Sequence, residues 1–169
     1  VLVVGAGGLG SPALLYLAAA GIGRLGVIDD DRVDVTNLNR QVIHRSDDVG
    51  RWKADSAAAA LRAFRPDLAL DVYPEALTAA NAAALFRGFD AIVDGSDNFD
   101  TRYVVSDATS AAGIPCVWGS VLRFEGQVST FWGAAPGGAG LTLRDVFPEP
   151  PDPGTVPSCS EAGVLGAVC

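Results

Sequence analysis

The chain has 169 residues, enough for one domain with a sizeable core and too few for two ordinary domains. Twelve Lys and Arg against 20 Asp and Glu give a net charge of −8, which argues against nucleic acid as a partner because a polyanion would be repelled. Hydrophobic residues make up 49% of the chain, but charged residues and glycines interrupt every apolar run before it reaches membrane-spanning length. We therefore expect a soluble protein that does not enter a membrane.

The three cysteines are Cys116, Cys159 and Cys169, too few and too far apart for a disulfide framework. No secretory signal segment opens the chain, so a reducing cytoplasm is the expected compartment. The sequence contains no Met, and it begins and ends inside apolar runs. We expect residues 1–169 to form a single domain that is incomplete at both ends.

Strands and helices are predicted to alternate along most of the chain. A β-branched run at 1–4 predicts a strand, the glycine-rich segment 5–10 a turn, and residues 11–20 a helix. Further strands are predicted at 24–29, 68–73, 91–94 and 116–118, and further helices at 51–64, 78–86 and 101–112. This alternation predicts an α/β fold of the Rossmann-like, doubly wound type, with a mostly parallel sheet covered by helices on both faces.

The pattern changes after residue 118. Segments 119–124 and 127–132 flank Glu125-Gly126, which predicts an antiparallel hairpin appended to the sheet. Residues 133–158 contain repeated Gly and Pro and show little periodicity, so we expect a long, mobile crossover loop there.

The glycine-rich turn has the spacing of a nucleotide-binding motif. Gly5, Gly7 and Gly10 fit G-x-G-x-x-G between a strand and a helix, where backbone N–H groups meet phosphate at the positive end of the helix dipole. Asp29 follows Gly10 by nineteen residues, at the expected end of the second strand, where a carboxylate can accept hydrogen bonds from ribose hydroxyls. These features alone fit an NAD-binding domain.

A polar segment after Asp29 carries more functional side chains than a dinucleotide site needs. Arg40 and Lys53 can neutralise phosphate oxygens, and Asp97 can hold Mg²⁺. All three follow the carboxyl ends of predicted parallel strands, so we expect them to converge on one crevice. Because NAD has only a pyrophosphate, this set favours a triphosphate, and we expect the two cations to create a locally positive site in a negative protein.

The chain also resembles the ThiF/MoeB/HesA family, bacterial relatives of ubiquitin-activating enzymes. The resemblance rests on ordered motifs at 5–10, 36–41, 50–54, 96–98, 123–127 and 159–166. It implies that ATP and Mg²⁺ are used to adenylate the C-terminal glycine of a ubiquitin-like sulfur carrier ending in Gly-Gly, with release of pyrophosphate, in molybdopterin, thiamin or related sulfur-transfer biosynthesis. It also implies a homodimer.

The resemblance further implies a role for individual residues. Gly8 and Asp29 would bind the adenosine, while residues 36–40 with Lys53 would hold the phosphates and Asp97 with Asn98 would serve Mg²⁺ and the nucleotide. The implied nucleotide-binding set is Gly5, Gly7, Gly8, Gly10, Asp29, Thr36, Asn37, Leu38, Asn39, Arg40, Lys53, Asp97 and Asn98. The implied catalytic set is Arg40, Lys53, Asp97 and Cys159.

Two cysteine sites of the family differ in what they imply here. A cysteine at position 159 forms a thioester or acyl-persulfide in some members and is dispensable in others, so a reactive and a simply packed Cys159 both stay open. Many members also carry a zinc site of two C-x-x-C pairs, but Thr142 and Asp145 stand where the first pair would be. Four-coordinate zinc then lacks half of its ligands, and we expect no zinc.

Two alternatives to adenylation remain at the level of sequence. One is an NAD-dependent oxidoreductase domain, which leaves Arg40, Lys53 and Asp97 without a role. The other is a non-catalytic relative that binds nucleotide or carrier as a scaffold. His44, the one histidine of the chain, is expected on a helix-packing or surface position, and Cys116 is expected in the core.

Overall fold

The computed structural model describes residues 1–152, 155 and 163–169, and Cys159 therefore lies outside the described residues. A single six-stranded sheet has the order β3-β2-β1-β4-β5-β6, in which every neighbouring pair is parallel except β5 with β6. The strands are β1 (Leu2–Val4), β2 (Arg24–Ile28), β3 (Ala69–Tyr73), β4 (Ile92–Asp94), β5 (Cys116–Leu122) and β6 (Glu125–Phe131). The predicted doubly wound α/β fold is confirmed.

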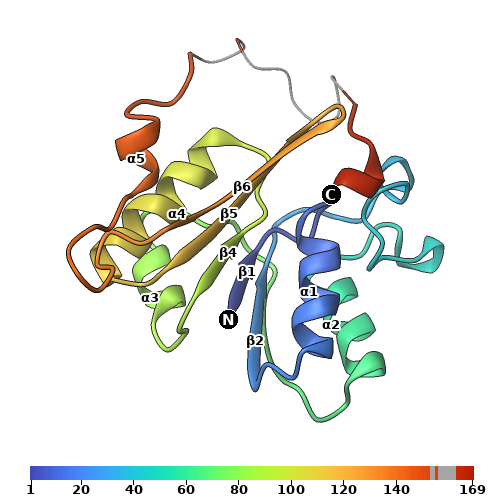
Figure 1. Ribbon diagram of the computed structural model, residues 1–169. Helices are drawn as coiled ribbons and strands as arrows, with labels where there is room; N and C mark the ends of the chain where they lie inside the picture. Colours follow the sequence, from blue (N-terminus) through green and yellow to red (C-terminus); the bar gives the residue numbers. More distant parts are fainter. Residues whose placement is uncertain (153–154, 156–162) are drawn as a thin grey trace.

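Helices cover both faces of this sheet (Figure 1). On one face lie α1 (Gly10–Ala19) and α2 (Lys53–Phe64), and on the other α3 (Ala82–Phe86) and α4 (Phe99–Ala112). Short 3₁₀ helices η1 (Val35–Asn37), η2 (Ser46–Asp48) and η3 (Gly166–Val168) lie outside the sheet. No helix among the described residues is long and apolar enough to cross a membrane.

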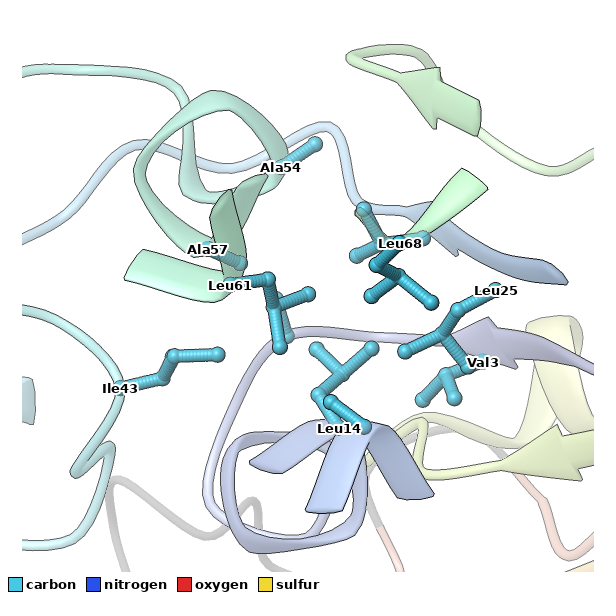
Figure 2. Packing of buried hydrophobic residues seen from close by; sticks show 11 residues of the cluster. Val3, Leu14, Leu25, Ile43, Ala54, Ala57, Leu61 and Leu68 are labelled. Atoms are coloured by element: carbon cyan, nitrogen blue, oxygen red, sulfur yellow. The ribbon is translucent and has the colours of Figure 1, made fainter. Parts of the chain in front are cut away.

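Side-chain alternation along β1 divides the core into two layers. Val3 packs with α1 and α2, whereas Leu2 and Val4 pack with α3 and α4, as the twofold period of a strand buried on both faces requires. Figure 2 shows the first layer, where Leu14 of α1 and Leu61 of α2 meet the strand residues. Ile43 joins the same cluster from the segment between η1 and η2, which anchors that segment beside the sheet.

The predicted hairpin is confirmed, but the predicted position of its turn is wrong. The expected strand 116–118 continues without a break to Leu122, which pairs with Glu125, so the turn consists of Arg123 and Phe124. Arg123 adopts the left-handed φ of 56° that such a tight turn demands. Gly126 is a strand residue instead, and a Cβ there would lie 3.3 Å from Val168, so close approach of the last segment explains the glycine.

The expected crossover loop contains a helix that the sequence analysis missed. Residues 143–146 form α5 (Leu143–Val146), whose buried Leu143 joins the aromatic cluster around Trp118. Thr142 and Asp145 form a reciprocal capping box, in which the Thr142 N–H and hydroxyl donate to Asp145 at 2.7 and 2.8 Å. The two residues that replace the C-x-x-C pair therefore start this helix.

Candidate functional site

An open pocket lies at the carboxyl ends of β1, β2 and β4. The order of the sheet reverses between β1 and β4, and this is the place where doubly wound proteins bind ligands. The expected site residues that line the pocket are Gly5, Gly7, Gly8, Asp29, Arg40, Lys53, Asp97 and Asn98.

The glycine turn brings the start of α1 against the end of β1. Gly5 has a φ of +89°, and a Cβ on it would lie 3.0 Å from the carbonyl oxygen of Gly95, beyond β4. Gly10 does not line the pocket, and a Cβ there would collide with the carbonyl oxygen of Gly5. The third glycine of the motif therefore allows close helix packing, which places the positive end of the α1 dipole at the pocket.

Asp29 ties the end of β2 to the glycine turn. One carboxylate oxygen accepts the Ala6 N–H at 2.7 Å and the other accepts the Asp31 N–H at 2.9 Å. Burial raises the pKa of Asp29 above its ordinary value, and these hydrogen bonds and the charge of Lys53 only partly oppose that rise. Since each carboxylate oxygen accepts more than one hydrogen bond, Asp29 retains capacity for a ribose hydroxyl.

Lys53 is a buried cation at the start of α2. Its residue is only 5% exposed, and its Nζ donates to Asp31 at 2.9 Å. A buried ammonium group needs such a partner, because leaving it unpaired costs several kcal/mol or neutralises it. The Asp31 side chain is 71% exposed, so this carboxylate lies at the rim, between the buried lysine and solvent.

Arg40 is held by the turn that precedes it. Its Nη1 donates to the Asn39 side chain at 3.1 Å and to the Thr36 carbonyl at 3.4 Å, and its stem lies beside Gly8. The expected nucleotide ligands Thr36, Asn37, Leu38 and Asn39 do not line the pocket in the described part of the chain. In this structure these four residues shape the segment that carries Arg40.

The loop after β4 places Asp97 and Asn98 at the pocket. Both are exposed, and Asn98 also accepts the Thr101 N–H at 2.8 Å, capping α4. Beneath the loop, buried Asp94 accepts the N–H and the hydroxyl of Ser96, and burial raises the pKa of Asp94. The contacts between Asp94 and Ser96 therefore hold the loop in place, while Asp97 is exposed at the pocket.

The donor chemistry at the pocket fits a magnesium ion carried by a nucleotide. No group of three or more His, Cys, Asp or Glu side chains that could hold a metal ion occurs among the described residues. Nucleotide-bound Mg²⁺ needs no such cage, because one or two carboxylates and the phosphates of the substrate hold it together with water. Asp97 lines the pocket and has the chemistry to provide one such carboxylate.

The expectation of a locally positive site is wrong for the residues that line the pocket. Among the described residues that line the pocket, the acids outnumber the cations by five to three. The acids are Asp29, Asp30, Asp31, Glu75 and Asp97, and the cations are Arg40, Lys53 and Arg102. Attraction for a polyanion must therefore come from the N-terminus of α1, from well-placed cations and from a metal ion, and not from net charge.

Several lining residues were missed by the sequence analysis. Gln41 is 4% exposed, and its Oε1 has no hydrogen-bond partner among the described residues. Arg102 projects from α4 and donates to the Ser96 carbonyl at 3.1 and 3.3 Å. Cys169 lies beside Gly8, where a Cβ would come within 3.0 Å of its sulfur. Only Gln41 carried a signal, since it ends the motif at 36–41.

Cys116 and His44 are both buried. Cys116 is buried in β5 as expected, and burial raises the pKa of its thiol. Of the two positions expected for His44, the surface position is wrong: the residue is 7% exposed, and its ring contacts Ser56 of α2 and the Ala6 carbonyl of the glycine turn.

The pocket lies where the strand order of the sheet reverses, and it combines a glycine turn, a carboxylate at the end of a strand and the two cations Arg40 and Lys53. These features define a nucleotide-binding domain of the doubly wound class. The chain belongs to the ThiF family, which matches residues 1–169. It is 57% identical to the probable adenylyltransferase/sulfurtransferase MoeZ of Mycobacterium tuberculosis, over all of this chain and 43% of the relative. It is 50% identical to the sulfur carrier protein adenylyltransferase of Thermus thermophilus, over 99% of this chain and 62% of the relative.

A solved structure shares the fold as well. The E. coli tRNA N6-threonylcarbamoyladenosine dehydratase TcdA, in complex with ATP, is 34% identical and superposes with a TM-score of 0.68 over 72% of this chain and 51% of that one. The chain spans 43% of the length of MoeZ, 51% of TcdA and 62% of the Thermus protein. The names of the curated relatives favour adenylyl transfer, and with it the use of ATP, over the NAD-dependent alternative.

Proposed function

We propose that this domain adenylates the C-terminal carboxylate of a ubiquitin-like sulfur carrier ending in Gly-Gly, using ATP with Mg²⁺. The observation that carries the proposal is the gathering of the glycine turn, Arg40, Lys53 and Asp97 around one pocket. Similarity to a protein named sulfur carrier protein adenylyltransferase supports the substrate class. A homodimer, a cytoplasmic location, the absence of zinc, and a place in molybdopterin, thiamin or related sulfur transfer belong to the same proposal.

The reaction joins two anions, so charge repulsion and orientation dominate its barrier. A carrier carboxylate oxygen attacks the α-phosphorus of ATP, the bond from that phosphorus to the bridging oxygen of the β-phosphate breaks, and pyrophosphate leaves with the bond electrons. The products are an acyl-adenylate and pyrophosphate. Mg²⁺, when bound near Asp97, would neutralise part of the phosphate charge.

The residues of the chain divide this task. Asp29 and Gly8 hold the adenosine and its ribose, and the N–H groups at the start of α1 face the phosphates. Arg40, carried by residues 36–39, and Lys53 neutralise charge that develops on the phosphates. Because Lys53 donates to Asp31 without nucleotide, phosphate binding makes it exchange or share that partner.

The test is pyrophosphate exchange into ATP, measured with the full-length protein and its carrier. Arg40→Ala or Lys53→Ala should reduce carrier-dependent exchange by at least ~100-fold, the usual effect of one preorganised electrostatic group. Arg62→Ala, which removes an exposed cation from the same helix as Lys53, is the matched control and should exchange normally. Unchanged exchange in both pocket variants would refute the proposal.

The same assay separates the remaining possibilities. ATP binding without any exchange in the wild-type protein would identify a non-catalytic relative.

A role for Cys159 in a thioester or persulfide stays a separate part of the proposal. Alkylation of Cys159 that leaves sulfur transfer intact would assign this cysteine a packing role.

A further inference from the structure

We infer that His44 is a positioning residue for the nucleotide, which turns the Ala6 carbonyl away from the pocket so that the glycine turn offers N–H groups to phosphate. The His44 ring bridges two elements: its Nε2 lies 2.8 Å from the Ala6 carbonyl oxygen, and its Nδ1 lies 2.8 Å from the Ser56 hydroxyl of α2. This inference rests on the proposed function, because it concerns the same nucleotide.

The hydrogen-bond partners determine the proton position on the ring. A carbonyl oxygen only accepts, so Nε2 carries the proton, and Nδ1 of the neutral ring accepts the Ser56 hydroxyl. Burial lowers the pKa of His44 and so does the charge of Lys53, whereas the hydrogen bond to Ala6 and the charge of Asp48, which also interacts with the Ser56 hydroxyl, act in the opposite direction. The neutral ring with its proton on Nε2 is therefore the form in place at neutral pH.

Ala6 is held on both sides. Asp29 accepts its N–H at 2.7 Å and thereby fixes the peptide before it. The peptide after Ala6 is fixed by His44 and by a longer contact, 3.3 Å, from the Ser11 hydroxyl. Ala6 is fully buried, so its carbonyl would lack a partner of comparable strength without the histidine.

The orientation of that second peptide decides what the phosphate meets. A trans peptide directs its C=O and N–H to opposite sides, so a carbonyl held against His44 sends the Gly7 N–H the other way. Gly7 lines the pocket, and its N–H donates to no other group within the described residues. If the peptide rotated, which glycine permits at little cost, a carbonyl oxygen would face the anionic phosphate instead.

The position of the ring is set by its neighbours and not by the ligand. Ile43 is inserted into the core layer shown in Figure 2, which fixes the backbone beside His44. Ser56 lies one turn after Lys53 on α2. His44 thus connects the glycine turn with the helix that presents Lys53, and its loss should weaken nucleotide binding more than it weakens the fold.

The test compares two substitutions of His44 with the wild-type protein. His44→Phe keeps a ring and removes both hydrogen bonds, whereas His44→Gln keeps an N–H donor for Ala6. We expect His44→Phe to raise the Kd for ATP with Mg²⁺ and the KM for ATP at least ~10-fold, with kcat changed less than ~3-fold, because only the longer contact with Ser11 would then hold the peptide after Ala6 in place. His44→Gln should restore most of the affinity. Val42→Ala, an exposed position on the same segment, should change nothing.

A second readout reports the contact itself. The ¹⁵N spectrum of histidine-labelled protein, compared with that of His44→Phe, should show a ring protonated at Nε2, with signals that shift when ATP is added. Wild-type affinity in His44→Phe overturns the inference alone, as does a weakening that Gln does not relieve or a ring protonated at Nδ1. A wild-type protein that does not bind ATP overturns the inference and the proposed function together.

Discussion

Removing the negative charge of Asp31 should strengthen ATP binding, although Asp31 contacts a residue of the proposed machinery. Its carboxylate accepts from Lys53 at 2.9 Å and competes with phosphate for that cation. Coulomb's law at this separation, with a water-like dielectric constant because the Asp31 side chain is 71% exposed, gives about 1.4 kcal/mol. Asp31→Asn removes most of this competition and one of five acids from the pocket lining, so we expect the Kd to fall about three- to tenfold.

Calorimetric titration with ATP and Mg²⁺ at two salt concentrations measures this effect, which salt should reduce. The matched control is Asp55→Asn, which removes an exposed acid from the first turn of α2, outside the pocket lining. Asp55→Asn should lose no more than about 1 kcal/mol of unfolding free energy, whereas Asp31→Asn should lose more, because it leaves the buried Lys53 ammonium with a neutral acceptor. Only Asp31→Asn should bind ATP more tightly. Weaker binding by Asp31→Asn would refute the reasoning, since it would show that Asp31 serves the nucleotide and does not compete with it.

Two further predictions concern the fold. Leu61→Ala, at a fully buried position between α2 and the sheet, should lower the free energy of unfolding by about 2–5 kcal/mol in urea titrations. Asp94 has a pKa that burial raises, so the folded state binds its proton more tightly than the unfolded state, and stability is lost as pH rises from about the ordinary Asp value through the folded pKa. Asp94→Asn should therefore show a smaller decline in stability between pH 4 and pH 7, and an unchanged decline would contradict this assignment.

The parallel sheet was predictable because its signals are local. Each element can be recognised from a few neighbouring residues: a β-branched run for a strand, a glycine-rich segment for the turn, and an alanine-rich segment for a helix. The parallel topology then brings Arg40, Lys53 and Asp97 to one edge of the sheet. The hairpin turn was misplaced for a physical reason. Glycine is common in turns, but Gly126 lies in a strand and makes room for Val168, forty-two residues away in the chain. No local sequence pattern predicts such a contact.

The supporting residues of the site were hidden for the same reason. His44 has an ordinary sequence context, and only the fold reveals that its two nitrogens bridge residues 6 and 56. Residues 36–40 were all predicted to be phosphate ligands, yet in the structure the first four of them shape the chain around Arg40. A motif records which residues occur together, whereas the structure separates those at the pocket from those that hold them.

Each cation of the pocket donates a hydrogen bond to an acceptor of the protein itself. This feature suggests how an acidic protein could hold a triphosphate. Lys53 donates to Asp31, Arg40 to the side chain of Asn39, and Arg102 to a backbone carbonyl, so each is already directed by a protein acceptor before nucleotide arrives. Such contacts restrict flexible side chains in advance, which lowers the entropy that binding must remove. Because these acceptors are a mostly exposed carboxylate, an amide and a carbonyl, the stronger charge of a phosphate can replace or join them. Under the proposed function, placement and exchange of partners, and not an excess of positive charge, would account for nucleotide affinity in a chain of net charge −8.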